Sequence, residues 1–328
     1  MTTWAHVGNG DSVPAISLLN VFTTWVFEPL ALFVILTAGL LYGAGIVVLR
    51  RRGDSWPLGR RASFLLGGLG ALVVATCSSL AAYDDVLLSM HMVQHMVLSM
   101  VAPIFLALGS PVTLALRTLP GSPRSVLLKL LHSRAASILA FAPVAFTLFI
   151  VSPWVLYFSG LYEATLSSTV LHNLLHVHFV MVGCLFFWPL LGLDPVPGRV
   201  AYPFRLLTVF ATLPFHAFLG VTIMAMETVI AADWYFALDR HWPPSPLEDQ
   251  GIAGGILWGS GDLVGSVIFA VLFVQWIRES AREAAREDRR LDRAERARAG
   301  SPPEQSTVHE AARMSGSAPG SSDGADSR

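Results

Sequence analysis

The apolar residues of this chain are gathered into long blocks separated by shorter polar stretches. Each block holds about 20 residues, the length of a helix that crosses about 30 Å of hydrocarbon at a rise of 1.5 Å per residue. This pattern predicts an all-α polytopic membrane protein embedded in a lipid bilayer. Seven transmembrane helices are expected, with approximate limits 26–49, 62–82, 86–109, 136–158, 167–192, 204–226 and 251–276.

Composition supports this class of protein and argues against others. Of the 328 residues, 53% are hydrophobic and only 14% are charged, unlike an ordinary soluble domain. The formal net charge of −1 gives no electrostatic basis for binding nucleic acid. The two cysteines, Cys77 and Cys184, are far apart, so neither a disulfide framework nor a cysteine-based zinc site is predicted. No nucleophile-and-base set or phosphate-binding glycine loop is recognisable, so an enzyme is not expected.

The charges in the connecting loops predict the orientation of the chain. By the positive-inside rule the amino terminus is outside and the carboxyl terminus is cytoplasmic, and no cleavable signal peptide is expected. The basic residues follow the first, third and fifth blocks: Arg50, Arg51, Arg52, Arg60, Arg61, Arg117, Arg124, Lys129, Arg134, Arg199 and Arg205. The acidic residues occupy the alternate loops: Asp84, Asp85, Glu163, Glu227, Asp233, Asp239, Glu248 and Asp249.

The sequence divides into four parts. Residues 1–25 are expected to be an extracytoplasmic segment, followed by the transmembrane domain over 26–276. Charges alternate at helical spacing over 277–299, which predicts a solvated cytoplasmic helix, with a basic helix on the membrane surface as the alternative. Residues 300–328 are rich in Ser, Gly, Pro and Ala without periodicity, and are expected to be disordered.

Five histidines fall within the predicted spans at related depths. The third block carries HMVQHM, which places His91 and His95 four residues apart, and the fifth carries HNLLHVH with His172 and His176. Both blocks are expected to enter from outside, so the two pairs lie at nearly the same depth. His216 in the sixth block lies near mid-membrane. These positions predict a histidine layer in the outer half of the bilayer.

This layer is a candidate metal site. Ionisable residues within a membrane usually face the bundle interior or a pathway. Two imidazoles spaced by four residues project from one helix face one turn apart, and two such faces opposed would offer four nitrogen ligands. The alternative is that the imidazoles only form hydrogen bonds between helices. His178 lies about 160° around the helix from His176 and is predicted to face elsewhere.

Nearby sulfur atoms favour copper as the metal. Imidazole suits copper, zinc, iron and nickel, whereas thioether sulfur favours Cu(I). Met92 and Met96 accompany the first histidine pair, so Cu(I) is the predicted ion. Cys77, near the outer end of the second block, is a candidate thiolate ligand, with a small buried core residue as the alternative.

Three carboxylates could take part. Asp84 and Asp85 directly precede the third block and, with Tyr83, form a polar mouth that could capture a cation; the alternative is an ordinary polar helix start. Asp262 falls near the middle of the seventh block, where a carboxylate needs a partner, a proton or an ion. His216 is its expected partner.

Three segments resemble a known family. They are the run after Asp84, HMVQHMVLSMVAPIFLALGSPVTLALR, then HNLLHVHFVMVGCLFFWPLLGLDP, and then LPFHAFLGVTIM. In this order they are similar to the multispanning CtaG family of cytochrome c oxidase assembly factors, over about residues 20 to 275. The resemblance implies a seven-span protein of the bacterial plasma membrane that helps to mature a haem-copper oxidase by supplying copper to its catalytic subunit. The histidines that match are His91, His95, His172, His176 and His216.

These observations lead to one hypothesis with two alternatives. Cu(I) would be captured at the outer mouth, held by the histidine layer and passed laterally to the oxidase catalytic subunit. One alternative is a haem- or quinone-linked membrane oxidoreductase, in which one histidine from each pair ligates haem. The other is a transporter that moves copper across the whole membrane. It would need ligands in the inner halves of the spans, which hold mostly Leu, Val, Phe and Gly.

Overall fold

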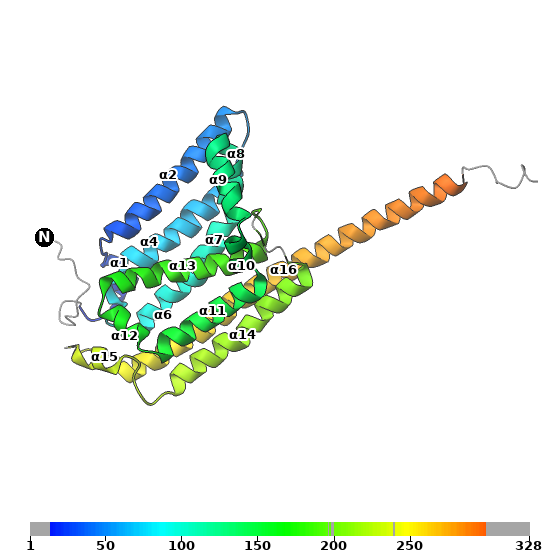
Figure 1. The fold of residues 1–328 in the computed structure, drawn as a ribbon. Helices are drawn as coiled ribbons and strands as arrows, with labels where there is room; N and C mark the ends of the chain where they lie inside the picture. The colour runs from blue at the N-terminus through cyan, green and yellow to red at the C-terminus, as the bar shows by residue number, and fades with distance from the viewer. Residues whose placement is uncertain (1–13, 196, 198–199, 239, 300–328) are drawn as a thin grey trace, which may run out of the picture. The chain divides into compact units, whose positions relative to one another are not determined.

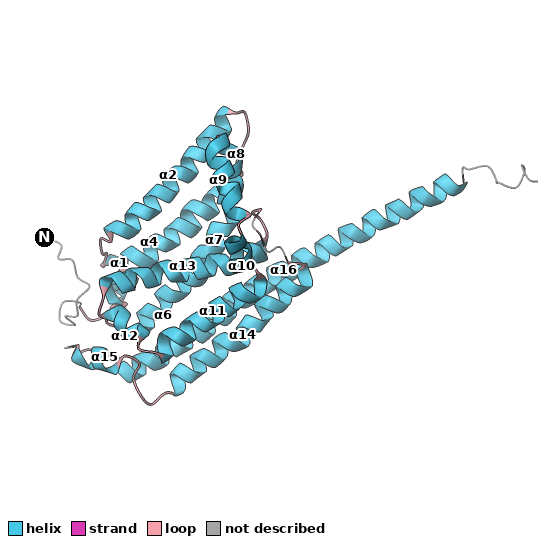
Figure 2. Ribbon diagram, in the orientation of Figure 1, coloured by secondary structure: helices cyan, strands magenta, loops and turns pink. Residues whose placement is uncertain are grey.

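The computed structural model describes residues 14–195, 197, 200–238 and 240–299. Every regular element within these residues is helical, so the predicted all-α fold class is confirmed (Figures 1 and 2). Six helical stretches are long and apolar enough to cross a membrane. They are Pro29–Arg51, Leu58–Tyr83, Leu88–Thr118, Thr169–Leu191, Tyr202–Ala225 and Pro246–Arg296.

The first part of the chain builds two of its spans from several consecutive helices. Two of these pieces, η2 and η3, are π-helical, a form that occurs mostly as short bulges and is frequent at functional sites. The elements are α1 (Leu18–Thr23), α2 (Pro29–Arg51), α3 (Leu58–Ala62), η2 (Ser63–Leu69), α4 (Gly70–Cys77), α5 (Ser79–Tyr83), α6 (Leu88–Met96), η3 (Val97–Val101), α7 (Ala102–Leu108) and α8 (Pro111–Thr118).

The second part of the chain has longer uninterrupted helices. Its elements are α9 (Gly121–Leu131), α10 (Arg134–Leu139), α11 (Ala142–Phe158), α12 (Leu161–Leu166), α13 (Thr169–Leu191), α14 (Tyr202–Ala225), α15 (Ala232–Ala237) and α16 (Pro246–Ala299). Helices α1, α12 and α15 lie at one end of the bundle, and α8, α9 and α10 lie toward the other (Figure 1).

The fourth predicted block is divided in the structure. A single helix was expected over 136–158, but α10 ends at Leu139 and α11 begins at Ala142, with Pro143 in its first turn. Proline has no N–H to donate to the carbonyl four residues earlier, which disfavours a continuous helix, and the first turn of a helix tolerates it, so Pro143 suits the start of α11. Helix α11 therefore has 17 residues and is apolar but shorter than the six spans.

Asp194 joins the loop after α13 to the start of α8. Its Oδ1 accepts hydrogen bonds from the backbone N and the Oγ1 of Thr113 at 2.8 and 2.6 Å. Its Oδ2 accepts from Val112 N at 3.3 Å and from Trp188 Nε1 at 3.2 Å. Ser110, the N-cap residue of α8, makes no side-chain cap, so Asp194 satisfies the free N–H groups in its place.

Helix α13 packs unusually closely on η3. A Cβ atom added at Gly183 would lie 2.1 Å from the carbonyl oxygen of Ser99 and 2.6 Å from Cγ of Pro103. Only glycine allows the two backbones to approach this far. The close approach brings the histidine-bearing turns of α13 beside those of α6, which leads directly into η3.

We expect Gly183→Ala to destabilise the protein by about 1–3 kcal/mol, the usual cost of overpacking a filled interior. Gly43→Ala is the matched control, because nothing lies within 4 Å of its added Cβ and alanine favours a helix. Thermal unfolding in detergent measures both variants. The Gly183 variant should melt at a lower temperature than wild type and the Gly43 variant should not; equal melting of the two would contradict the close packing.

The chain forms two compact units, Met1–Val274 and Gln275–Arg328. The described part of the second unit is the end of α16, where ion pairs join Glu279 to Arg282 at 3.4 Å and Glu287 to Arg290 at 3.8 Å. This agrees with the charge alternation in the sequence. Residues 1–13 and 300–328, with Arg199 and Asp239, lie outside the described residues, so the expectations for them stay predictions.

Candidate metal centre

Asp84 is carried into the bundle by the connection between α5 and α6. After Tyr83 the chain turns, with Val86 N and Leu87 N donating to the Tyr83 carbonyl at 3.1 and 2.8 Å. Helix α6 then starts at Leu88. Tyr83 and Asp84 are both fully buried, rather than exposed at the surface as the sequence suggested.

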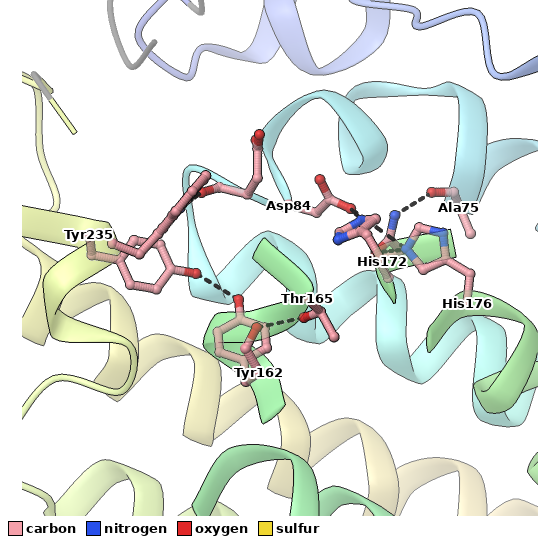
Figure 3. Close-up of polar contacts among 10 residues, drawn as sticks. Ala75, Asp84, Tyr162, Thr165, His172, His176 and Tyr235 are labelled. Atoms are coloured by element: carbon pink, nitrogen blue, oxygen red, sulfur yellow. Dashed lines mark hydrogen bonds and ion pairs between the residues drawn. The ribbon is translucent and has the colours of Figure 1, made fainter. Parts of the chain in front are cut away.

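Helix α13 places two histidines opposite Asp84. The helix begins at Thr169, and the side chain of its N-cap, Ser168, accepts a hydrogen bond from Leu171 N at 3.5 Å. His172 and His176 follow one turn apart on one face, as their spacing of four predicts, with ring centroids 4.5 Å apart. Both rings lie on the side of α13 that faces Asp84 (Figure 3).

These three side chains form a compact cluster of potential ligands. His172 Nε2 lies 2.9 Å from Asp84 Oδ2, and His176 Nε2 lies 3.7 Å from the same oxygen (Figure 3). One ligand atom from each residue lies within 4.8 Å of the other two. Within the described part of the chain, this is the one group of three His, Cys, Asp or Glu residues with that geometry. We call it the outer cluster.

The carboxylate of the outer cluster is held in its charged form. Burial alone would raise the pKa of Asp84, but the adjacent His172 and His176 favour the carboxylate and lower this pKa below its ordinary value. Asp84 Oδ1 is buried and has no hydrogen-bond partner among the described residues. An ionised carboxylate with one unused oxygen beside two imidazoles is chemically suited to a cation.

Gln94 orients one of the two histidines, a role that the sequence reasoning missed. Its side-chain N–H donates to the Ala75 carbonyl at 2.9 Å. Its Oε1 lies 3.0 Å from His176 Nε2 and can only accept, so this nitrogen donates in the metal-free protein. The signal was present: Gln94 is the polar residue between the two histidines of HMVQHM.

His91 lies beside the outer cluster without belonging to it. Its side chain is fully buried, and neither ring nitrogen has a hydrogen-bond partner among the described residues. Its ring centroid is 4.8 Å from that of Tyr162, whose hydroxyl is hydrogen-bonded to that of Tyr235 at 2.7 Å. Burying an unpaired polar group costs about 1–3 kcal/mol. His91 is also close enough to Asp84 for the two to interact electrostatically.

His95 makes a different set of contacts. Its Nδ1 lies 2.9 Å from the Tyr157 hydroxyl, and its ring stacks on Phe179 with centroids 4.0 Å apart. The same hydroxyl donates to the sulfur of Met92 at 3.6 Å. The predicted set of four nitrogens from two opposed histidine pairs is therefore not assembled, because Asp84 occupies the position expected for the pair on α6.

The remaining candidate ligands lie outside the outer cluster. His216 donates from Nδ1 to the Thr212 carbonyl at 3.1 Å, and with His95 and His178 it lines a small cavity deeper in the bundle. His178 faces away from the outer cluster, as its angle from His176 predicts, and contacts Ser152 with Nε2 at 3.0 Å. Asp262 accepts from Trp258 Nε1 at 2.8 Å and lies within electrostatic range of His216, its predicted partner.

Three further candidate ligands, Cys77, Met96 and Asp85, contact residues outside the outer cluster. Cys77 is buried, with its sulfur 3.6 Å from Thr76 Oγ1, and Met96 is a buried core residue. Asp85 is partly exposed, and its backbone carbonyl accepts from Trp234 Nε1 at 2.8 Å. None of the three is a member of the outer cluster.

Comparison with known proteins identifies relatives of this chain. A family model described as cytochrome c oxidase caa3 assembly factor (Caa3_CtaG) matches residues 40–279. Uncharacterized proteins of Mycobacterium bovis and Mycobacterium tuberculosis are each 42% identical over 251 residues, covering 74% of this chain and 38% of each relative. An uncharacterized protein of Mycobacterium leprae is 38% identical over 255 residues, covering 75% of this chain and 38% of that relative.

No solved structure matches this chain. The aligned region spans well under half the length of these curated relatives. The family match nevertheless covers most of the chain, including the outer cluster and all five predicted histidines. The chain therefore belongs to the cytochrome c oxidase caa3 assembly factor family.

Proposed function

We propose that this protein binds copper in the outer cluster and supplies it to the catalytic subunit of a haem-copper oxidase during assembly. The main support is the convergence of Asp84, from the α5–α6 connection, with His172 and His176 of α13 inside the bundle. The family assigns the process, oxidase assembly, and the cluster supplies a chemical means of taking part in it. In this account the protein holds and transfers an ion and does not turn over a small molecule.

The donor set fits copper. Imidazole nitrogens bind copper in both common oxidation states, and the carboxylate adds a preference for the dication. Met92, one of the two methionine ligands expected from the sequence, already accepts a hydrogen bond from Tyr157, and Met96 is a buried core residue. The proposal for Cu(I) therefore rests on the two imidazoles. His91 is a further candidate donor, because it is unpaired, buried and within electrostatic range of Asp84.

We also propose a seven-span topology in a bacterial plasma membrane, with α11 as the short fourth span and the outer cluster toward the outside. The charges support this orientation. Arg51, Arg60 and Lys129 belong to α2, α3 and α9, whereas Glu163 and Asp233 belong to α12 and α15 at the opposite end of the bundle. Positive charge is retained on the cytoplasmic side, so the end that holds Asp84 faces outward.

The experiment is to replace Asp84 by Asn, and separately His172 by Gln, in cells that make the oxidase. We expect the purified oxidase to contain less than about half of its normal copper per haem. The reason is that loss of a direct ligand lowers the copper affinity of the assembly factor by more than the 10–100-fold typical of a supporting residue. Metal analysis of the oxidase provides the measurement.

The controls are Asp233→Asn and His132→Gln, because both residues are exposed and distant from the cluster in sequence. Immunoblotting establishes that every variant reaches the membrane in equal amount. Full copper in the oxidase from the cluster variants would overturn the proposed function. A loss of copper in the two controls as well would show a general effect of altering this protein.

A further inference from the structure

A second group of histidines surrounds a cavity deeper in the bundle. The cavity is small, about 10 Å³, which is room for about one water molecule or ion. It is formed between α6, η3, α11, α13 and α14. Its polar lining comes from His95, Ser99, Ser152, His178 and His216.

Each of the three histidines uses one ring nitrogen as a donor and keeps the other as a lone pair. The Tyr157 hydroxyl donates to a sulfur atom, so it accepts from His95 Nδ1 and leaves Nε2 with the lone pair. His216 Nδ1 donates to a carbonyl, which also leaves Nε2. Ser152 Oγ donates to the Leu148 carbonyl, so it accepts from His178 Nε2 and leaves Nδ1.

One of the histidines that line this cavity, His178, is exposed on the surface of α13. It lies nine residues into α13, about 14 Å along the helix at 1.5 Å per residue, and its side chain is exposed. A polar ring exposed on the middle of an apolar span is costly in a bilayer and usually marks a functional position. Here it lines the small cavity together with the buried His95 and His216.

We propose that this cavity is a second copper site, selective for Cu(I), with His178 at its lateral opening. The proposal rests on the proposed function and extends it from one site to two. The described residues that line the cavity include no carboxylate, so an ion there is held by neutral donors. An apolar surrounding with neutral nitrogen donors favours a singly charged soft ion over a dication.

The three histidines of this cavity are less tightly grouped than the residues of the outer cluster. In the described part of the chain, the condition of three ligand atoms within 4.8 Å of one another is met by the outer cluster and not by these three histidines. The second site is therefore more open than the outer cluster. Cu(I) is bound well by two imidazoles, so the proposed site consists of His178 and one of the two buried rings, and it is incomplete without His178.

The position of Gly261 supports a tight fit around His216. A Cβ atom added at Gly261 would lie 2.9 Å from Cδ2 of the His216 ring. Helix α16 therefore presses against this ring and limits its movement. Asp262, the next residue, is a charge close to the second site without lining it.

The test is an anaerobic Cu(I) titration of the detergent-purified protein against a coloured Cu(I) chelator. We expect wild type to bind two equivalents. His178→Gln should bind one, because glutamine can still donate to Ser152 but has no imidazole lone pair. The outer double variant His172→Gln/His176→Gln should also bind one, and the exposed control His132→Gln should bind two.

The outcomes separate the two proposals. Two equivalents bound by His178→Gln would overturn the second site. One equivalent in wild type that disappears in the outer double variant would overturn the second site while leaving the proposed function intact. No copper bound by wild type would overturn both.

A second variant, Ser152→Val, tests the same site independently, in case His178→Gln misfolds. Ser152→Val removes the acceptor of His178 and adds a methyl group beside the cavity, without changing an imidazole. We expect one of the two Cu(I) ions to bind about 10–100-fold more weakly, as for the loss of an orienting hydrogen bond at a metal site. Unchanged affinity in a variant that unfolds at the wild-type temperature would count against the second site.

Discussion

Asp84→Asn should lower the affinity of the purified protein for Cu²⁺ by more than about 100-fold, because loss of a direct ligand exceeds the 10–100-fold effect of a supporting residue. Asparagine has nearly the same shape, and its oxygen can still accept from His172 Nε2, which lies 2.9 Å from Asp84. The substitution therefore removes the charge and keeps the local structure. Affinity for Cu(I) should fall less, because the two imidazoles remain.

Competition with a chelator of known affinity measures both ions. Asp233→Asn is the control, since it removes an exposed charge from the same end of the bundle. An equal and small effect of the two substitutions on Cu²⁺ binding would show that the Asp84 carboxylate is not a ligand. Circular dichroism should show the same helix content for both variants and for wild type.

Asp194→Ala should destabilise the protein by about 3 kcal/mol or more, because hydrogen bonds to charged groups contribute about 1.5–3 kcal/mol each and their donors would be left unpaired. Four donors converge on this buried carboxylate, from Val112, Thr113 and Trp188. Copper binding by the protein that remains folded should be unchanged, because Asp194 is not part of the outer cluster.

Asp54→Ala is the matched control for this prediction. Asp54 pairs with Arg117, a residue of α8, as Asp194 does with Thr113 of the same helix. Both side chains of the Asp54–Arg117 pair are more than two-fifths exposed. An exposed ion pair contributes about 0–1 kcal/mol, so this variant should unfold close to the wild-type temperature. Similar melting of the Asp194 and Asp54 variants would contradict the capping role of Asp194.

The hydropathy pattern predicted the architecture well because span length is set by the thickness of a bilayer. Six of the seven blocks correspond to helices that are long enough, and the exception is interrupted between Leu139 and Ala142, beside Pro143. The spacing of His172 and His176 also predicted their shared face, since residues four apart project together from any α-helix.

The partner of that histidine pair could not be predicted in the same way. The helical periodicity of a sequence predicts which residues share a face of one helix. It does not predict which neighbouring helix that face contacts. Asp84 reaches His172 because the turn after Tyr83 is buried, a tertiary effect. For the same reason, the angle between His176 and His178 did not reveal that His178 meets His95 and His216 across a cavity.

Some residues in the segments that resemble the family stabilise the fold and others orient a proposed ligand. The sequence alone did not show which residue has which role. The segment WPLLGLDP includes Asp194, which caps α8. The segment HMVQHM supplies Gln94, which fixes the donor nitrogen of His176. One motif therefore stabilises the fold and the other orients a proposed ligand, a distinction that required the contacts of each side chain.

The most direct test is the metal content of the protein purified from copper-supplemented cells, for wild type and for His172→Gln/His176→Gln. Elemental analysis should find copper near stoichiometric amounts in wild type, and markedly less in the double variant at equal protein yield. Wild-type copper content in the double variant, or wild-type protein that contains no copper, would contradict the account.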